Sequence, residues 1–387
     1  MKQKRIISIL LIVMMVLTVL TGCSSSKVKL PAQAEVTDQA LKDVFAEHGM
    51  KVGTCVSSRV IDTQKYADLV KGQFNSLTME NAMKPDYILN QKDSQAAGKP
   101  VVELNSEVLS ILNWAKTNGF SMRGHTLIWH SQTPDWLFRE NFASSGPYVG
   151  REEMLRRMEA LISGIFEELD DHGYLDLFYA YDVVNEAWME DGSMRTSNWK
   201  RIIGDDYLWY AFYYADRYAP ESIDLYYNDY NEQYKAECIA DFVETLKDDD
   251  GRYLIDGIGL QAHLFTEDDL ANYLDGVDVL AETGLKLELT EVDLGLGKYE
   301  GAKSATDANL RVQGQYFYEL FEGLFKRVDE GKLRMDAVTF WGFSDGLSWR
   351  REYSPQLYDS DLDPKYALYG VMQIKEHAGY ESAETAK

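Results

Sequence analysis

Short apolar runs alternate with longer segments of helical periodicity along most of this chain. From Val36 onward, eight runs rich in β-branched and aromatic residues can be counted, at Val52–Val56, Ser76–Met79, Ser121–Leu127, Phe178–Val184, Ile223–Tyr227, Gly257–Gln261, Leu285–Thr290 and Ala337–Trp341. Such alternation is typical of a parallel sheet covered by helices. Eight units predict an α/β fold, a (β/α)8 TIM barrel in a single domain. An open, doubly wound sheet is the alternative, but it often has a glycine-rich phosphate turn, which does not follow the first run.

Three of the intervening helices carry clear signals. Residues 151–171 predict an amphipathic helix whose apolar stripe packs on the barrel, with apolar positions at Met154, Met158, Leu161, Ile162, Ile165, Phe166 and Leu169. Asn105 or Ser106 can cap a helix that runs to Asn118 and ends at Gly119. Another helix is expected to begin at Asn231 or Glu232 and to run to the turn at residues 248–251.

The first 36 residues have the pattern of an export signal and a linker. Basic residues precede an apolar run over residues 6–20, and Leu20-Thr21-Gly22-Cys23 resembles a bacterial lipobox, whose cysteine receives a lipid. We expect residues 1–22 to be removed as a lipoprotein signal peptide, and residues 23–36 to comprise the lipid-anchor Cys23 and a flexible tether. The alternative is a simple signal peptide with a chance cysteine. Residues 37–380 would then form the folded domain, exported and lipid-anchored to the bacterial membrane or cell surface, with a tail at 381–387.

Composition narrows the classes of partner. The formal net charge of −24 would repel nucleic acid and anionic lipid headgroups, so a neutral partner is favoured over a phosphorylated one. Cys55 and Cys238 lie in apolar elements without a CxxC neighbour, which favours buried unpaired thiols over a disulfide. No zinc spacing such as HExxH is present, and we expect no metal and no cofactor. The 8 Trp and 25 Tyr residues, many just after apolar runs, suit a sugar-stacking surface.

The residues that follow the predicted strands are unusually polar. They are Glu80, Asn81, His125, Asn185, Glu186, Asn228, Gln261, His263, Glu291, Asp293 and Trp341. In a barrel these positions converge over one mouth, and the glutamates after the fourth and seventh strands would face each other there. A facing pair of carboxyl groups is what cleavage of a glycosidic bond needs, one protonated and one ionised. Taken alone, either glutamate could instead cap a helix or pair with a surface lysine.

Local sequence around these positions carries a resemblance to a known family. Tyr181–Glu186 and Leu289–Asp293 resemble the acid/base and nucleophile segments of family 10 glycoside hydrolases, which are retaining β-xylanases. Five further segments are similar to family segments and occur in family order, namely 74–84, 123–130, 227–231, 257–263 and 340–342. The resemblance covers about Val36 to Ile374. It implies an endo-1,4-β-xylanase that cleaves xylan and xylo-oligosaccharides by double displacement, with its two catalytic carboxyls about 5 to 5.5 Å apart, and we expect a monomeric catalytic domain.

The resemblance also implies the roles of individual residues. Glu186 is implied as the general acid/base and Glu291 as the nucleophile, with Asn185 binding the 2-hydroxyl of the attacked sugar. Gln261 is expected close to the nucleophile.

A chain from Glu291 through His263 to Asp293 would orient the attacking carboxylate and keep it ionised. Without the neighbouring motif, His263 would be interpreted as a core histidine.

The remaining implied contacts are with substrate. Sugar hydroxyls on the non-reducing side are expected to bind Glu80, Asn81, Lys84, His125, Trp129 and Gln132. Trp341 and Trp349 are expected to wall the same subsites, and Asn228 and Tyr230 to lie on the leaving-group side. The sequence does not sort His130, Trp136, Trp188 and Trp209 between core and site.

Two segments depart from the family pattern. Leu347 stands where many relatives carry an aromatic residue, which leaves the shape of the glycone wall open. Asp363-Pro364-Lys365-Tyr366 replaces the common Lys-Pro-Ala-Tyr, a change we expect to concern only the closing helix. Two other functions stay open as alternatives: a related barrel enzyme acting on glucan, cellulose or mannan, and a lipid-anchored glycan-binding protein.

Overall fold

The computed structural model describes residues 27–380, which form a closed parallel barrel. Its eight strands are β1 (Lys51–Val56), β2 (Ser76–Met79), β3 (Ser121–Gly124), β5 (Phe178–Asn185), β6 (Asp224–Asp229), β7 (Gly257–Leu260), β9 (Lys286–Gly295) and β10 (Ala337–Phe340). Each strand pairs with the next, and β10 pairs with both β9 and β1, so the sheet has no free edge. The predicted (β/α)8 fold is confirmed.

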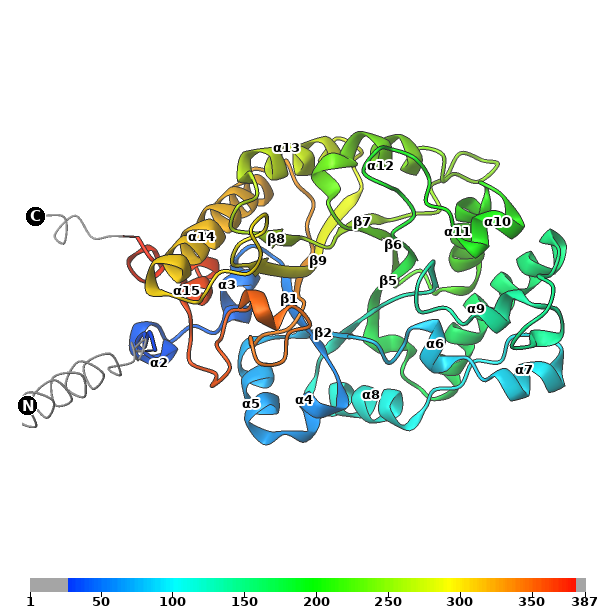
Figure 1. Ribbon diagram of the computed structural model, residues 1–387, viewed down its shortest axis with the longest axis horizontal. Helices are drawn as coiled ribbons and strands as arrows, with labels where there is room; N and C mark the ends of the chain where they lie inside the picture. The colour runs from blue at the N-terminus through cyan, green and yellow to red at the C-terminus, as the bar shows by residue number, and fades with distance from the viewer. Residues whose placement is uncertain (1–26, 381–387) are drawn as a thin grey trace, which may run out of the picture.

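Helices form an outer ring around these strands (Figure 1). They are α2 (Gln33–Val36), α3 (Leu41–Glu47), α4 (Ser58–Asp62), α5 (Gln64–Gln73), α6 (Pro85–Ile88), α7 (Gln91–Ala97), α8 (Ser106–Asn118), α9 (Arg151–Asp171), α10 (Asn198–Ile203), α11 (Tyr207–Tyr218), α12 (Ala236–Val243), α13 (Leu270–Ala281), α14 (Asp307–Asp329) and α15 (Tyr366–Val371). Short 3-10 turns lie at η1 (Asp135–Phe138), η2 (Glu140–Phe142), η3 (Leu175–Leu177), η4 (Glu232–Tyr234), η5 (Arg351–Tyr353) and η6 (Lys375–His377). Within the described residues, no helix is long and apolar enough to cross a membrane.

The predicted helices after the second and third strands are confirmed. Asn105 caps α8 by accepting the N–H groups of Glu107 and Val108, and Gly119 ends it in a left-handed conformation. The predicted apolar stripe of α9 is buried along its whole length.

The helix expected after β6 is shorter than predicted. Asn231 has a left-handed φ of 52° and makes no capping hydrogen bond, so the chain first forms η4 and only then α12. The helix ends at Val243 instead of near residue 248, because Leu246 turns into the core and Lys247 bridges to Tyr253.

Two strands of the barrel are broken where they reach its mouth. After β3 the chain leaves the sheet and returns as β4 (Ile128–Trp129), which also pairs with β5. After β7 it leaves at Gln261 and Ala262 and returns as β8 (His263–Phe265), which pairs with β9. Such interruptions of a ladder re-aim side chains. The strand predicted over Ser121–Leu127 therefore ends early, and the residues in both breaks are candidates for the site.

The segment before the barrel packs against it. Lys27 Nζ lies 2.6 Å from carboxylate oxygens of both Asp359 and Asp361 and 3.3 Å from Asp363. Val28 and Leu30 pack on an apolar cluster made by Leu296, Leu310 and Tyr366. Residues 27–36, predicted as part of a flexible tether, are thus attached to the domain, because Val28 and Leu30 pack on this cluster. Cys23 lies outside the described residues.

Both cysteines within the described residues are free thiols, as expected. Cys55 is buried in β1. Cys238 is only partly buried, contrary to expectation, because its sulfur lies near the surface of α12, 3.7 Å from the carbonyl of Gly192.

A buried ion network crosses the barrel interior beneath the mouth. Arg123 of β3 donates two hydrogen bonds to Asp182 of β5, at 2.5 and 2.6 Å, and one to Glu288 of β9 at 2.9 Å. Asp182 also binds Nδ1 of His125 at 2.8 Å. Because each of these side chains is at most 2% exposed, the charges are compensated by one another and by the Tyr226 hydroxyl, which donates to Glu288 at 3.1 Å. Gly124 is required beside them, since an added Cβ would lie 2.2 Å from the ring of Tyr181.

Replacing Arg123 should destabilise the fold strongly. Arg123→Met leaves two buried carboxylates without their partner, and we expect the free energy of unfolding in urea to fall by about 3 to 5 kcal/mol. Arg156→Met is the control, because it removes an exposed ion pair with Glu153 worth less than about 1 kcal/mol. Equal effects of the two changes would contradict this account.

Candidate active site

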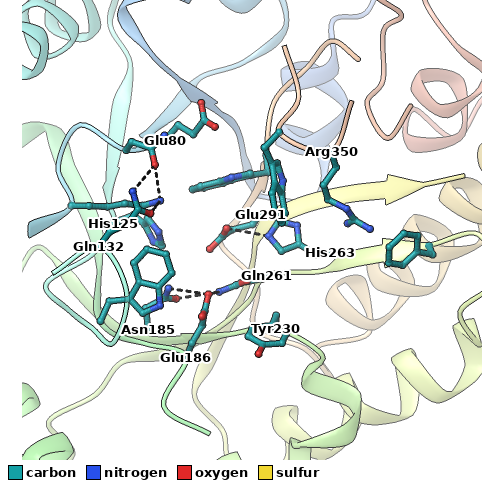
Figure 2. Close-up of a pocket in the computed structure, with 16 residues that line it drawn as sticks. Glu80, His125, Gln132, Asn185, Glu186, Tyr230, Gln261, His263, Glu291 and Arg350 are labelled. Carbon is teal, nitrogen blue, oxygen red and sulfur yellow. Dashed lines mark hydrogen bonds and ion pairs between the residues drawn. The ribbon is translucent and has the colours of Figure 1, made fainter. Parts of the chain in front are cut away.

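The mouth of the barrel contains a cavity of about 600 Å³. It is lined by Glu80, Asn81, Lys84, His125, Trp129, Gln132, Asn185, Glu186, Tyr230, Gln261, His263, Phe265, Glu291, Trp341, Trp349 and Arg350. In Figure 2 the carboxyl groups of Glu186 and Glu291 point into the same part of this cavity. Of the candidates from the sequence, the structure brings all into the cavity wall except Asn228 and Asp293.

Glu186 combines a strained backbone with a buried carboxyl group. It follows β5 with a left-handed φ of 58°, a conformation that costs energy in a non-glycine residue and recurs at functional sites. Gln261 Nε2 and Asn185 Nδ2 donate to its Oε1 at 3.2 and 3.3 Å. Burial raises the pKa of Glu186, and the charge of Glu291 adds to this effect, although the hydrogen bond from Gln261 opposes it. A raised pKa suits a general acid.

Glu291 has the opposite character. It lies within β9 and is 5% exposed. Asn228 Nδ2 donates to its Oε1 at 2.8 Å, and His263 Nε2 lies 3.3 Å from its Oε2. Burial alone would raise its pKa, but the hydrogen bond from His263 and the charges of His125, His263 and Lys84 lower the pKa to about 2. Glu291 is therefore ionised at neutral pH, as a nucleophile must be.

His263 supplies much of this positive charge. Its Nδ1 lies 3.1 Å from Oδ1 of Asp293, on the side of the ring away from Glu291. Burial opposes protonation, yet Asp293 and Glu291 together raise the pKa of His263 to about 10. Asp293 is itself held by Arg350 Nη1 and by Nε1 of Trp349 at 3.1 Å. The predicted order of Glu291, His263 and Asp293 is therefore present, and Arg350 extends it.

Asn228 lies behind the cavity wall, which corrects its expected position. Strand β6 continues to Asp229, so Asn228 is a fully buried strand residue that faces the barrel interior. Its Nδ2 donates to Glu291 and, at 3.0 Å, to Oδ1 of Asn185, while Thr290 donates to its Oδ1 at 2.6 Å. Asn228 thus orients both carboxyl-bearing strands and does not face the leaving group.

One flank of the cavity is a network of amide and ammonium groups. Lys84 Nζ donates to Asn81 and to Gln132, both at 3.0 Å, and Gln132 donates to Asn81 at 3.2 Å. Lys84 also lies 5.0 Å from the ring of Trp129. Burial lowers the pKa of Lys84 and raises that of Glu80 beside it. These fixed donors and acceptors suit the recognition of vicinal hydroxyls.

Two tryptophans line the cavity, and they differ in how far their rings are exposed. Trp341 is 6% exposed and makes an edge contact with His125, with ring centroids 5.4 Å apart. Trp349 is 59% exposed, and its ring is fixed by the bond to Asp293 and an edge contact with His263. An exposed, oriented indole can stack on a sugar ring.

The departure at residues 363–366 affects the site, contrary to expectation. Lys365 is buried, and its Nζ binds Asp345 at 3.0 Å and the carbonyls of Ser354 and Gln356 at 2.7 and 2.8 Å. These groups lie in the loop that carries Trp349 and Arg350. The segment therefore fixes part of the cavity wall as well as the start of the closing helix.

The structure also sorts the residues that the sequence left open. His130 Nε2 lies 3.9 Å from Oε2 of Glu186, and burial together with nearby Arg195 lowers its pKa to about 4, so it is neutral near the acid. Tyr230 lines the cavity and accepts a hydrogen bond from Arg195 at 2.7 Å. The other three residues do not line the cavity. They pack, partly buried, against the core, and they are Trp136, Trp188 and Trp209.

Two residues of the cavity wall were missed from the sequence. Phe265 lies two residues after His263 in β8, so strand periodicity could have placed it on the same face. Arg350 directly follows Trp349, but nothing in its neighbours indicates a buried partner across the mouth. Between residues 27 and 380, no group of three or more His, Cys, Asp and Glu side chains is placed to hold a metal ion.

Fold and site together define a class of protein. A (β/α)8 barrel with two carboxyl groups in one cavity at its mouth, whose pKa values are shifted in opposite directions, is a barrel glycosidase. More narrowly, residues 40–374 match the family model described as glycosyl hydrolase family 10, and the chain belongs to that family.

Individual relatives agree with this assignment. The bifunctional endo-1,4-beta-xylanase XylA of Ruminococcus flavefaciens is 37% identical over 348 residues, covering 87% of this chain and 34% of that protein. An endo-1,4-beta-xylanase of Geobacillus stearothermophilus is 33% identical, covering 87% of this chain and 98% of that one. Among solved structures, a Clostridium thermocellum endo-1,4-beta-D-xylanase complexed with xylohexaose superposes with a TM-score of 0.79 at 33% identity, covering 88% of this chain and 68% of that one. The chain spans about a third to a half of several curated relatives, 34%, 51% and 32% in three of them.

The contact between His263 and Glu291 predicts how the acidic limb of the kcat/KM profile depends on His263. His263→Asn removes a positive charge that lowers the pKa of Glu291, so that pKa should rise and the acidic limb of kcat/KM should move to higher pH. The alkaline limb, set by Glu186, should stay in place.

A pH series of kcat/KM measures both limbs. His172→Asn is the control, since His172 pairs with Glu168 on the surface, and its profile should match the wild type. An acidic limb that does not move in His263→Asn would refute the role of His263.

Proposed function

We propose that this chain is a retaining endo-1,4-β-xylanase. The observation that carries the proposal is the pair Glu186 and Glu291, which share one cavity and have pKa values shifted in opposite directions. Glu186 gives its proton to the departing glycosidic oxygen while Glu291 attacks the anomeric carbon, forming a covalent glycosyl-enzyme. Glu186 then takes a proton from water, which hydrolyses that intermediate.

Xylan is the substrate that the cavity supports best. Relatives matching most of the chain are named endo-1,4-beta-xylanases, and solved relatives hold xylohexaose or xylotriose. The fixed amide and ammonium groups around Lys84 would bind hydroxyls on the non-reducing side, and Trp349 would stack on the sugar. Tyr230 would lie on the leaving-group side. The catalytic domain would act as a monomer.

A comparison of polysaccharides tests this function. Reducing ends should appear fastest on xylan, compared with carboxymethylcellulose and mannan, and proton NMR should show the β-anomer as first product. Glu291→Gln, which lacks the nucleophile, is the inactive control. Faster release from cellulose or mannan would contradict the substrate, and an early α-anomer would contradict the mechanism. Binding of xylan without cleavage would instead indicate a glycan-binding protein.

We further propose that the protein is exported and anchored by a lipid on Cys23. The support is the basic and apolar leader followed by Leu20-Thr21-Gly22-Cys23. Lys27 is held on the domain by Asp359 and Asp361, so the four residue steps from Cys23 span at most about 14 Å. Such an anchor would keep the catalytic domain close to the membrane surface.

Cys23→Ser should release the protein from the membrane fraction, because no lipid can then be attached. Immunoblots of membrane and soluble fractions measure the distribution. Cys238→Ser, which removes a partly buried free thiol, should leave it unchanged. Unchanged fractionation of Cys23→Ser would contradict the lipid anchor.

A further inference from the structure

Behind the cavity lies a buried carboxyl group that the reaction itself does not use. Glu232 belongs to η4, just after β6, and is 1% exposed. This turn packs against α13, which covers it from outside. Oε1 of Glu232 accepts a hydrogen bond from the backbone N–H of Ala262 at 2.9 Å. The side chain therefore reaches from the turn after β6 to the break between β7 and β8.

Ala262 is the centre of that break. It is fully buried and has a left-handed φ of 55°, a conformation that an alanine adopts only when its surroundings hold it. Its neighbours bind the two catalytic carboxyl groups separately. On one side Gln261 donates to Glu186 at 3.2 Å, and on the other His263 lies 3.3 Å from Glu291. In Figure 2 Gln261 and His263 reach Glu186 and Glu291 from this same segment.

Backbone bonds hold the N–H of Gln261 and the carbonyl of Ala262, and Glu232 holds the N–H of Ala262. The N–H of Gln261 donates to the carbonyl of Asp229 at 2.9 Å, and the N–H of Asp293 donates to the carbonyl of Ala262 at 3.4 Å. The N–H of Ala262 would be buried without a partner if Glu232 were removed, which is unfavourable for a backbone donor. Relaxation of Ala262 toward an ordinary conformation would then move both neighbouring side chains.

We propose that Glu232 is a positioning residue, which fixes the turn at Gln261–His263 and thereby holds the hydrogen bonds that this turn makes to Glu186 and Glu291. This inference rests on the proposed glycosidase function, because its consequence is read in turnover. One acceptor oxygen, Oε1 of Glu232, would thereby position the groups that contact both catalytic glutamates.

The surroundings of Glu232 fit this role. Burial raises its pKa to about 7, the N–H of Ala262 opposes this rise, and the nearby charges of Asp229 and Lys235 act in opposite directions. Tyr273 faces it from α13. A carboxyl oxygen accepts a hydrogen bond whether or not the group is protonated, so the bond to Ala262 persists across neutral pH.

Loss of this bond should move both limbs of the pH profile upward. Without the donor from Gln261, which favours its ionised form, Glu186 would have a higher pKa. Without the hydrogen bond from His263, Glu291 would also have a higher pKa. The charges of His125 and Lys84 would remain and would still lower it in part. A residue with a purely structural role would reduce the amount of folded enzyme and leave both limbs where they are.

The test compares two variants of similar shape. Glu232→Met lacks the acceptor oxygen, whereas Glu232→Gln keeps it. With an aryl β-xylobioside over pH 2.5 to 9, we expect Glu232→Met to lose about 10- to 100-fold in kcat/KM and to move both limbs up by roughly one pH unit. Glu232→Gln should keep the wild-type limbs. Glu232→Ala provides the same comparison if Glu232→Met does not fold.

Asp256→Leu is the matched control. Asp256 accepts the N–H of Leu225 at 2.8 Å at the opposite end of the barrel, so its loss should cost stability without moving either limb. Wild-type limbs in Glu232→Met, or equal shifts in Glu232→Gln and Glu232→Met, would overturn the positioning role alone. A wild-type enzyme that does not cleave the xylobioside would overturn the proposed function as well.

Discussion

A buried carboxyl group stays ionised when neighbouring positive charges or hydrogen-bond donors stabilise it, and at this barrel mouth His263 supplies much of that stabilisation. It stands between Glu291 and Asp293, at 3.3 and 3.1 Å, and Arg350 holds Asp293 from the far side. Glu186, buried in the same cavity without such a cation in contact, keeps its proton to higher pH. The difference in pKa between these two glutamate side chains thus comes from the groups that each one contacts.

The barrel provides the positions for these contacts through its irregularities. Regular parallel strands alternate their side chains between the interior and the helices. The breaks after β3 and β7 interrupt this alternation and place His125 and Gln261 at the cavity. Left-handed backbone at Glu186 and Ala262 turns the chain at the mouth in a similar way. Catalytic geometry here depends on departures from an ideal barrel, each held by buried hydrogen bonds.

Sequence patterns predicted the elements that repeat and missed those that depend on partners distant in the chain. The eight apolar runs gave the barrel, and the polar residues after them gave most of the cavity wall. Asn228 was misplaced because a polar residue inside a barrel resembles one that follows a strand. The pattern over residues 27–36 predicts a tether because their partners, such as Asp359, lie over 300 positions away. Arg350 and Glu232 were missed for the same reason, since each acts through a partner distant in the chain, Asp293 and Ala262 respectively.

Before substrate binds, the pKa values of the two catalytic glutamates are shifted in opposite directions, upward for Glu186 and downward for Glu291. A ¹³C NMR titration of glutamate side-chain carboxyls, with Glu186→Gln and Glu291→Gln for assignment, measures this directly. The account predicts that Glu291 titrates near pH 2 and Glu186 above the ordinary glutamate value of 4.5. Two titrations that coincide near 4.5, or that occur in reverse order, would contradict it.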